Sequence, residues 1–375
     1  MSRERILYIL VFCIVACFLI FEIVFIAISS SKNSKAKPIL ANPPENKKSP
    51  SLLKEVSNFK IPGVLNDQKR FIIEISVGNP PQKMRMLLDT GWKMFWVAAN
   101  PSLRGALFKN VFDESINLKS SDKKEWSDGA HGVSSGYCRM ERVSMGEHVF
   151  EEMEICFGTS FSGSRWNGMQ EFDGIIGLWP SGIFLSQIPS FLPDLTEKAF
   201  CFDFINADDK SVRSYDFIIG NCSPQDKQLN TIKVGSTWNA DLMGKSAVVK
   251  QHDTNEIKSI SLTSYNFWFD TGAYGVHLSP TDHAALFSYL ASLGSSNFHV
   301  YFPFGNGNIV LDCVQGPAFN NALVSNAILE CPYTLIGSFL LYGRFTKFDW
   351  DKMEFSIEKE TEGEGEYLIY HFPRA

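Results

Sequence analysis

The stretch LLDTGW, residues Leu87–Trp92, places an aspartate at the end of an apolar run and follows it with a hydroxyl residue and a glycine. The second half of the chain repeats this pattern as FWFDTGA, residues Phe267–Ala273. One such tripeptide arises easily by chance. Two copies, each after a strand-like apolar run, predict two β-turns that act as a pair. Asp89 and Asp270 are therefore the candidate catalytic residues.

Two neighbouring carboxylates have a specific chemistry. They cannot both ionise easily, so one pKa rises, the other falls, and the pair shares one proton. The ionised member can take a proton from a bound water while the protonated member supports the carbonyl oxygen under attack. This hydrolyses an amide without a metal or a cofactor. Gly91 and Gly272 allow tight turns, and the hydroxyls of Thr90 and Thr271 are predicted to bond across to the other half and fix the pair.

The organisation of the chain is mostly β. From Phe71 onward, short β-type runs follow one another and are broken by glycine and proline. The clearest helical signals are residues 189–199 and residues 279–294. After its D-T-G, each half also carries two aliphatic residues and a glycine, Ile175-Ile176-Gly177 and Leu335-Ile336-Gly337. This weak repeat predicts two similar β lobes with a cleft between them.

The N-terminus is typical of a targeting segment. Ile6–Phe21 is an unbroken apolar run, and Ile23–Ile28 extends it past Glu22, which makes it long for an ordinary signal peptide. We expect residues 1–28 to be an uncleaved signal anchor of a single-pass membrane protein with a luminal or extracellular catalytic domain. The alternative is a long cleaved signal on a secreted protein. Residues 29–66 are predicted to be a solvated stalk or a short pro-segment.

The charge of the chain excludes one class of partner. Residues 51–375 carry 28 basic and 38 acidic side chains, a net charge of −10. Because phosphate binding needs a basic stripe, we expect no nucleic-acid surface. The expected partner is a peptide or protein substrate, bound by a monomer.

Cysteine usage indicates an oxidising compartment. Six cysteines lie outside the apolar N-terminal run, and an even number after a targeting segment predicts disulfides. No C-x-x-C pair occurs, so no structural metal site is expected. Asn221-Cys222-Ser223 is a glycosylation sequon, but a disulfide at Cys222 would hinder its use. The expected pairs are local: Cys138–Cys156, Cys201–Cys222 and Cys313–Cys331.

Several motifs in combination resemble the pepsin-like aspartic proteases. The opening IIEISVGNPPQKMRMLLDTGWKMFWV is similar to that family's first-lobe start, with a tryptophan, Trp96, seven residues after the aspartate. FDGIIGL, FDTGA and LIGSFLLYGRFTKFDWDKMEFSI resemble its remaining motifs, and the similarity covers about three quarters of the chain. The resemblance implies a mainly β, bilobal fold with a substrate cleft and aspartic endopeptidase activity. It implies an N-terminal lobe of residues 67–200 and a C-terminal lobe of residues 201–375.

The sequence departs from that pattern beside both aspartates. The family usually places a serine or threonine after each D-T-G, where this chain has Trp92 and Ala273. Loss of a hydroxyl bond to an ionised oxygen is expected to raise the working pH. The indole of Trp92 must displace its neighbours or point away. In an active enzyme we expect it to pack beneath the flap hairpin, against Trp96 and Trp126.

The flap is also altered. The position of the family's flap tyrosine falls on Gly129, or on Asp128 if one residue is deleted, and neither is tyrosine. Trp126 is either a substitute or an apolar anchor at the hairpin base. We therefore weigh an active endopeptidase, with Trp92, Trp96, Gly129 and Ala273 in its cleft, against a catalytically silent pepsin-like binding protein. A structural ectodomain that uses the fold only as a scaffold is a third interpretation.

Overall fold

The first aspartate ends a strand that is buried in a parallel pair. In the computed structural model, β3 (Gln82–Asp89) pairs with β8 (Gly174–Gly177), and Asp89 lies opposite Gly177. β8 pairs on its other side, antiparallel, with β4 (Phe95–Ala98). A side chain at Gly177 would collide with the backbone carbonyls that follow the first D-T-G, so only glycine fits there.

The second aspartate occupies the equivalent place in the second half. β15 (Asn266–Asp270) pairs in parallel with β20 (Leu335–Gly337), and Asp270 lies opposite Gly337. β20 pairs antiparallel with β16 (Val276–Leu278). The repeat predicted from the two D-T-G turns and the two aliphatic-glycine motifs is thus one strand arrangement used twice.

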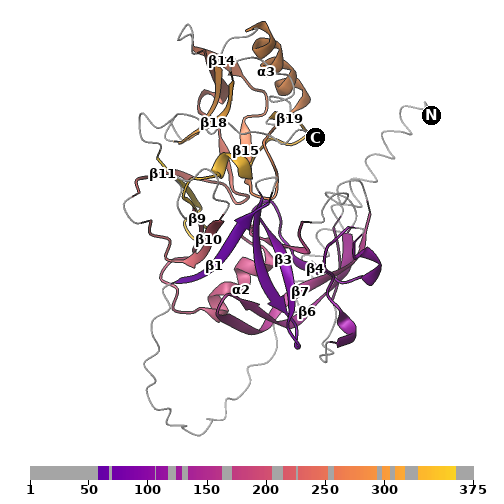
Figure 1. Ribbon diagram of the computed structural model, residues 1–375. Coiled ribbons are helices and arrows are strands. Elements are labelled where there is room, and N and C mark those ends of the chain that lie inside the picture. Colours follow the sequence, from indigo (N-terminus) through magenta and orange to yellow (C-terminus); the bar gives the residue numbers. More distant parts are fainter. Residues whose placement is uncertain are drawn as a thin grey trace, which may run out of the picture. The chain divides into compact units, whose positions relative to one another are not determined.

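The remaining strands complete three sheets (Figure 1). In the first half they are β1 (Asn58–Leu65), β2 (Phe71–Val77), β5 (Lys124–Asp128), β6 (Ser134–Met145) and β7 (His148–Phe161). After these come β9 (Ala199–Phe204), β10 (Ser214–Gly220), β11 (Leu229–Lys233), β12 (Asn239–Asp241), β13 (Ser246–Gln251), β14 (Ile257–Ser261), β17 (Phe298–Phe304), β18 (Ile309–Gly316), β19 (Ile328–Glu330), β21 (Thr346–Asp349) and β22 (Glu354–Glu358).

The largest sheet has thirteen strands and draws on both halves of the sequence. Its order is β11-β22-β21-β9-β10-β1-β2-β3-β8-β4-β7-β6-β5. A five-stranded sheet has the order β12-β15-β20-β16-β19, and a four-stranded sheet has the order β14-β13-β17-β18. Figure 1 shows β3, β4, β6 and β7 gathered together, and β14, β15 and β18 gathered together in the other half. This is the mainly β, bilobal architecture expected from the sequence.

The described part of the chain belongs to one compact unit, Lys54–Ala375. It consists of residues 58–66, 70–105, 107–116, 124–128, 134–162, 171–204, 214–224, 227–251, 257–293, 298–304, 309–316 and 328–359. The predicted signal anchor, residues 1–28, lies outside these ranges. Within them, no helix is long and apolar enough to cross a bilayer.

The core consists of a large central cluster, a smaller one confined to the first half, and a third of four buried residues, Ala199, Cys201, Cys222 and Phe345. The central cluster is rich in aromatic rings, such as the stacked pair Phe200 and Phe348, whose centroids are 5.0 Å apart. We call the smaller one the first-lobe cluster. Its buried members are Ile72, Leu87, Trp92, Trp96, Ala98, Phe108, Val111, Cys138, Cys156, Phe172 and Ile175.

One of the two predicted helices is confirmed and the other is displaced. α3 (Pro280–Ser292) begins as predicted: the Ser279 side chain accepts a hydrogen bond from the Asp282 amide, and proline follows the cap. The helix expected over 189–199 is instead α2 (Ile183–Phe191). It ends before Pro193, which disfavours helical backbone at the residue preceding it. Short 3-10 helices lie at Pro101–Leu103, Glu114–Ile116, Met243–Lys245 and Ser338–Leu341.

The predicted stalk, residues 29–66, extends too far. Asn58–Leu65 is not a solvated linker but β1, which pairs with β10 on one side and β2 on the other. Its side chains alternate strictly between exposed and buried, with Phe59 and Ile61 in the central cluster. That two-residue period was present in the sequence NFKIPGVL and is the signal that we missed. The predicted lobe boundary at residue 200 falls inside β9.

One predicted disulfide is confirmed and two are not formed in the structure. Cys138 and Cys156 are bonded across β6 and β7, with Cα atoms 3.8 Å apart because the two residues are directly opposed. Cys201, Cys222 and Cys331 carry free thiols, so the expected bonds Cys201–Cys222 and Cys313–Cys331 are wrong for this structure. Burial, then a hydrogen bond with Cys222, raises the pKa of Cys201, which keeps the thiol protonated and unreactive.

Candidate active site

The two D-T-G turns bring the carboxyl groups of Asp89 and Asp270 against each other. Each turn glycine lies beneath the carboxyl of the opposite lobe. A methyl group added to Gly91 would lie 2.6 Å from Cγ of Asp270, and one added to Gly272 would collide with the carboxyl of Asp89. A hydrogen bond joins the two aspartate side chains. Glycine is therefore required at both turns by the close approach of the partner carboxyl.

The threonines that follow the aspartates bond across the two lobes. The amide of Thr90 donates to Oγ1 of Thr271 at 3.0 Å, and the amide of Thr271 donates to Oγ1 of Thr90 at 2.9 Å. Each hydroxyl in turn donates to a carbonyl of the opposite lobe: Thr90 to Phe269 O at 2.6 Å, and Thr271 to Leu88 O at 2.7 Å. Both threonines are fully buried. These four bonds have the geometry of the cross-lobe bracing that we predicted.

Backbone amides hold the inner oxygen of each aspartate. The Gly91 amide donates to Oδ1 of Asp89 at 2.8 Å, and the Gly272 amide donates to Oδ1 of Asp270 at 2.9 Å. The Ala273 amide adds a longer bond to the same Asp270 oxygen, at 3.2 Å. Alanine thus supplies a backbone donor but no hydroxyl at this turn.

The environment of Asp89 favours its protonated form. Burial, first, and then the negative charge of Asp270 and the hydrogen bond to it raise the pKa of Asp89 well above its usual range. The hydrogen bond from the Gly91 amide and the positive charge of Arg70 lower the pKa of Asp89, but by less than the other effects raise it. One proton shared between two carboxyls is what general acid–base hydrolysis at this site requires.

The fold, the paired turns and the sequence similarity all identify the family. The profile described as eukaryotic aspartyl protease matches residues 70–325. The chain belongs to the eukaryotic aspartyl protease family. Vacuolar protease A of Aspergillus fumigatus is 27% identical over 237 residues, covering 62% of this chain and 52% of that protein. Aspartic proteinase A3 of Arabidopsis thaliana is 25% identical over 217 residues, covering 56% of this chain and 38% of that protein.

A further relative, probable vacuolar protease A of Arthroderma benhamiae, is 25% identical over 270 residues, covering 69% of this chain and 62% of that protein. The chain thus matches between about a third and two thirds of the length of these aspartyl proteases.

Trp92 is the largest departure from the family pattern, and its indole is directed into the first lobe. The side chain is only 6% exposed and belongs to the first-lobe cluster, together with Trp96 and the Cys138–Cys156 disulfide. The Trp92 carbonyl accepts a hydrogen bond from the Trp179 amide at 3.1 Å, which fixes the turn. Trp96, against which we expected Trp92 to pack, belongs to the same cluster. The side chain of Trp126 lies outside the described part of the chain.

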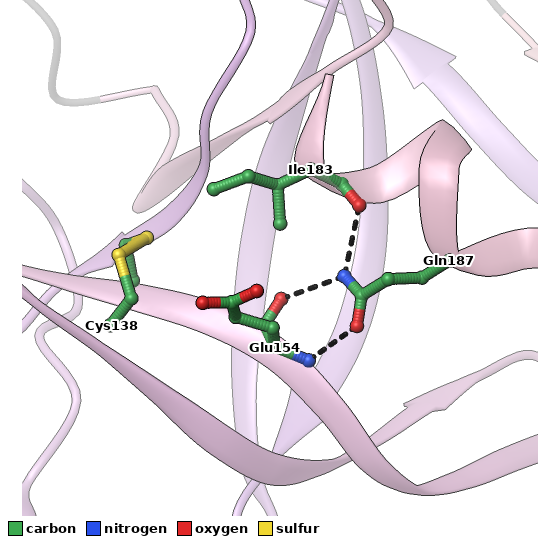
Figure 2. The surroundings of a disulfide bond; sticks show 5 residues. Cys138, Glu154, Ile183 and Gln187 are labelled. Atoms are coloured by element: carbon green, nitrogen blue, oxygen red, sulfur yellow. Dashed lines mark hydrogen bonds between the residues drawn. A yellow bond between two sulfur atoms is a disulfide. The ribbon is translucent and has the colours of Figure 1, made fainter. Parts of the chain in front are cut away.

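The hairpin that corresponds to the family's flap is formed by β5 and β6. The two strands pair antiparallel from Lys124 opposite Cys138 to Asp128 opposite Ser134. Gly129 and His131, in the loop between them, lie outside the described residues. The base of the hairpin is held by the disulfide from β6 to β7. Beside it, Gln187 of α2 bonds the Glu154 amide at 2.6 Å and the Glu154 carbonyl at 3.1 Å, as Figure 2 shows.

Two residues that support this aspartyl protease site were not predicted. The fully buried Trp238 donates its indole N–H to the Leu178 carbonyl at 2.7 Å, a second link between the halves. The buried Asp173 carboxylate accepts bonds from the Arg85 amide at 2.9 Å and the Asn110 amide at 2.7 Å, which fixes the approach to β8. Asp173 was quoted in the motif FDGIIGL, but Trp238 carried no local signal.

Proposed function

We propose that this protein is an aspartic endopeptidase in which Asp89 and Asp270 activate a water molecule. The observation that carries the proposal is the pair of facing carboxyls held by four reciprocal threonine bonds, with the Asp89 pKa raised. Thr90, Gly91, Thr271 and Gly272 position the pair.

The reaction follows from that geometry. The ionised carboxyl removes a proton from the water, and the resulting oxygen attacks the carbonyl carbon of the scissile amide. The protonated carboxyl donates to the carbonyl oxygen, so that a neutral diol forms. The carboxyl that took up the water proton then donates a proton to the amide nitrogen, while the other carboxyl takes a proton from a hydroxyl of the diol. The C–N bond breaks, and an amine and a carboxylic acid are released. The shared proton is restored at the end of the cycle.

The second candidate function is a catalytically silent binding protein. It is favoured by Trp92, whose indole completes a closed apolar cluster on the Asp89 side, and by Ala273, which removes a hydroxyl from the Asp270 side. The endopeptidase is preferred because neither change disturbs the bonds that hold the two carboxyls together.

The experiment is a cleavage assay with a peptide library from pH 3 to 7, with and without the aspartic-protease inhibitor pepstatin. We expect cleavage that pepstatin blocks and that both Asp89→Asn and Asp270→Asn abolish. Circular dichroism of the variants provides the folding control. Cleavage that survives both substitutions would refute the dyad, and absence of cleavage at every pH would favour the binding protein.

The cellular setting is also part of the proposal. Two of the relatives carry the word vacuolar in their names, and vacuoles are acidic, which suits a shared-proton pair. We place the catalytic unit in a luminal or extracellular compartment, tethered by residues 1–28 or released from them. The unit is expected to act as a monomer on peptide or protein substrates.

A further inference from the structure

The two aspartates differ in what lies beside them on their own strands. Residues two apart in a strand share a face, so Leu87 accompanies Asp89 and Trp268 accompanies Asp270. Leu87 is 2% exposed and covered by the first-lobe cluster, including Trp92. Trp268 is only half-buried, whereas its neighbours Phe267 and Phe269 are buried in the central cluster. The face beside Asp89 is therefore closed and the face beside Asp270 is partly open.

Trp268 is the centre of a row of rings that comes from both lobes. Its ring lies 6.0 Å from that of Trp179, at a near-perpendicular 87°, and 6.3 Å from that of Tyr333, at 18°. Tyr333 is 41% exposed. The Nζ of the exposed Lys93 lies 5.0 Å from the centre of the Trp179 ring. We call Trp179, Trp268 and Tyr333, with Lys93 at one end, the aromatic strip.

The aromatic strip is adjacent to both catalytic turns along the chain. Lys93 follows the first D-T-G by two residues, and the Trp179 amide is bonded to the carbonyl of Trp92. Trp268 precedes Asp270 by two residues, and Tyr333 precedes β20, which pairs with β15. Partly exposed rings offer apolar area and quadrupole contacts to another ring. The exposed lysine offers a charge that pairs with a carboxylate.

We propose that the aromatic strip is the main specificity site for the bound peptide, and that it selects an aromatic side chain with an acidic residue next to it. The peptide ring packs on Trp268 and Tyr333 and the acidic side chain pairs with Lys93, while the closed Asp89 side contributes little selectivity. This inference rests on the proposed function for its location, but it concerns binding and can be measured without turnover.

The test uses the full chain with Asp89→Asn, so that no peptide is consumed. Binding is measured by fluorescence anisotropy for three labelled peptides of equal length: one with Phe followed by Asp, one with Ala in place of Phe, and one with Lys in place of Asp. We expect the first to bind about tenfold more tightly than either of the others, as for a buried aromatic anchor with one charge pair.

Four further substitutions locate the preference. Tyr333→Ala and Trp268→Leu should reduce the preference for Phe over Ala several-fold, and Trp268→Phe, which keeps a ring, should restore most of it. Lys93→Gln should remove the preference for Asp over Lys. The matched control is Lys245→Gln, because Lys245 lies 4.3 Å over the ring of Tyr265 in a similar pair at the opposite end of β15.

The outcomes separate the strip from the proposed chemistry. If the peptide preferences vanish in the strip variants, the proposed role of the aromatic strip is supported, even if the wild type cleaves nothing and the endopeptidase proposal fails. If the strip variants keep the same peptide preferences, or if no peptide binds, the proposed role of the aromatic strip is overturned, even if the wild type is an active protease.

A second inference rests on an independent observation, the sequon Asn221-Cys222-Ser223. It is the one Asn-X-Ser/Thr sequence without an intervening proline among the 375 residues. Asn221 and Ser223 are exposed in the loop after β10, and Cys222 is a buried thiol. The Ser223 hydroxyl donates to Oδ1 of Asn221 at 2.7 Å. The disulfide that would have hindered modification is not formed in the structure, and the Cys138–Cys156 bond indicates an oxidising compartment.

We infer that Asn221 carries an N-linked glycan. The Asn221 amide nitrogen forms a bond to the anomeric carbon of an oligosaccharide donated by a lipid pyrophosphate, which leaves with the bonding electron pair while the amide loses a proton. Full-length protein from a eukaryotic secretory host should shift in gel mobility after treatment with an endoglycosidase. Asn221→Gln and Ser223→Ala should abolish the shift, and Ser223→Thr should keep it. Unmodified Asn221 by peptide mass spectrometry, beside a co-expressed reporter that is modified, would overturn the inference.

Discussion

Thr90 and Thr271 exchange hydrogen bonds, with the amide of each donating to the side-chain oxygen of the other at 3.0 and 2.9 Å. The orientation of each hydroxyl is fixed, because each also donates to a carbonyl of the opposite lobe. The arrangement joins the two halves at the point where the carboxyls meet. Its strength therefore sets how rigidly the dyad is held.

Replacing either threonine by valine should destabilise the protein, because the isosteric side chain leaves a buried amide and a buried carbonyl without partners. We expect a loss of about 2–4 kcal/mol in the free energy of unfolding, from about 1–3 kcal/mol for each unsatisfied group. Urea denaturation measures it. The matched control is Thr196→Val at an exposed position, where the change should be small. A loss at position 90 no larger than at position 196 contradicts the bracing role.

Asp89→Asn should stabilise the fold near neutral pH. Because the folded-state pKa of Asp89 is raised, the favourable contribution of the protonated group is present at acidic pH and is lost as the pH rises through that pKa. Asparagine does not ionise. The melting temperature of the Asp89→Asn variant should therefore exceed that of the wild type by a few degrees at pH 7, and the difference should shrink toward pH 4. Thermal scans across this range decide it. Exposed Asp194→Asn is the control, and an equal effect there would count against the dyad.

Ala273→Ser should move the acidic limb of the pH–rate profile to lower pH. Residue 273 already reaches the Asp270 carboxylate through its amide, at 3.2 Å, so an added hydroxyl is expected to donate to that carboxylate and support the ionised form of the pair. The profile of kcat/KM against pH measures the shift. The control is Ala273→Val, which enlarges the side chain without adding a hydrogen-bond donor. A pH shift of equal size with valine would exclude the hydrogen-bond explanation.

Trp92→Ser, by contrast, should cost stability because Trp92 fills a closed cluster. Truncating a buried tryptophan typically costs about 3–5 kcal/mol in the free energy of unfolding. The variant must remain folded despite this loss before its activity can be compared with that of the wild type. Trp92→Phe should cost less and serves as the comparison in the same denaturation experiment. A serine variant as stable as the wild type would show that the indole does not contribute to the first-lobe cluster.

Removing the Cys138–Cys156 bond should destabilise the flap base. The bond closes a loop with a sequence separation of 18 residues, which corresponds to about 3 kcal/mol of unfolded-state entropy. The double substitution Cys138→Ala/Cys156→Ala should show this loss in denaturation, with Cys331→Ala, which removes a free thiol, as the control. Non-reducing peptide mapping that joined Cys138 to any other cysteine would be incompatible with the structure.

The features predicted well from the sequence are those set by short-range chemistry. Asp89, Thr90 and Gly91 form one turn, and the same three residue types recur at Asp270. The position of each turn and the contact between the two could therefore be predicted from turn chemistry and from the repeat of the D-T-G sequence. Helix α3 followed from its Ser-Pro start for the same reason.

The features that escaped prediction depend on contacts between distant segments. The ring contact of Trp179 with Trp268 joins residues from the two halves, and the Trp238 bond to Leu178 does the same. The direction of the Trp92 indole was fixed by a pocket whose walls come from several strands. Two of the three predicted cysteine pairs are not bonded in the structure, because spacing along the chain does not reveal which thiols are joined.

The position of β1 limits how much of the N-terminal segment the folded unit could lose if the chain were processed. In the thirteen-stranded sheet β1 stands between β10 and β2, so it is the strand through which the two halves of that sheet are joined. Loss of β1, by truncation up to Leu65, would expose two unpaired strand edges on β10 and β2, which are templates for aggregation. Cleavage before Asn58 would leave the sheet intact. A protein that lacks β1 is therefore expected to be insoluble rather than merely inactive.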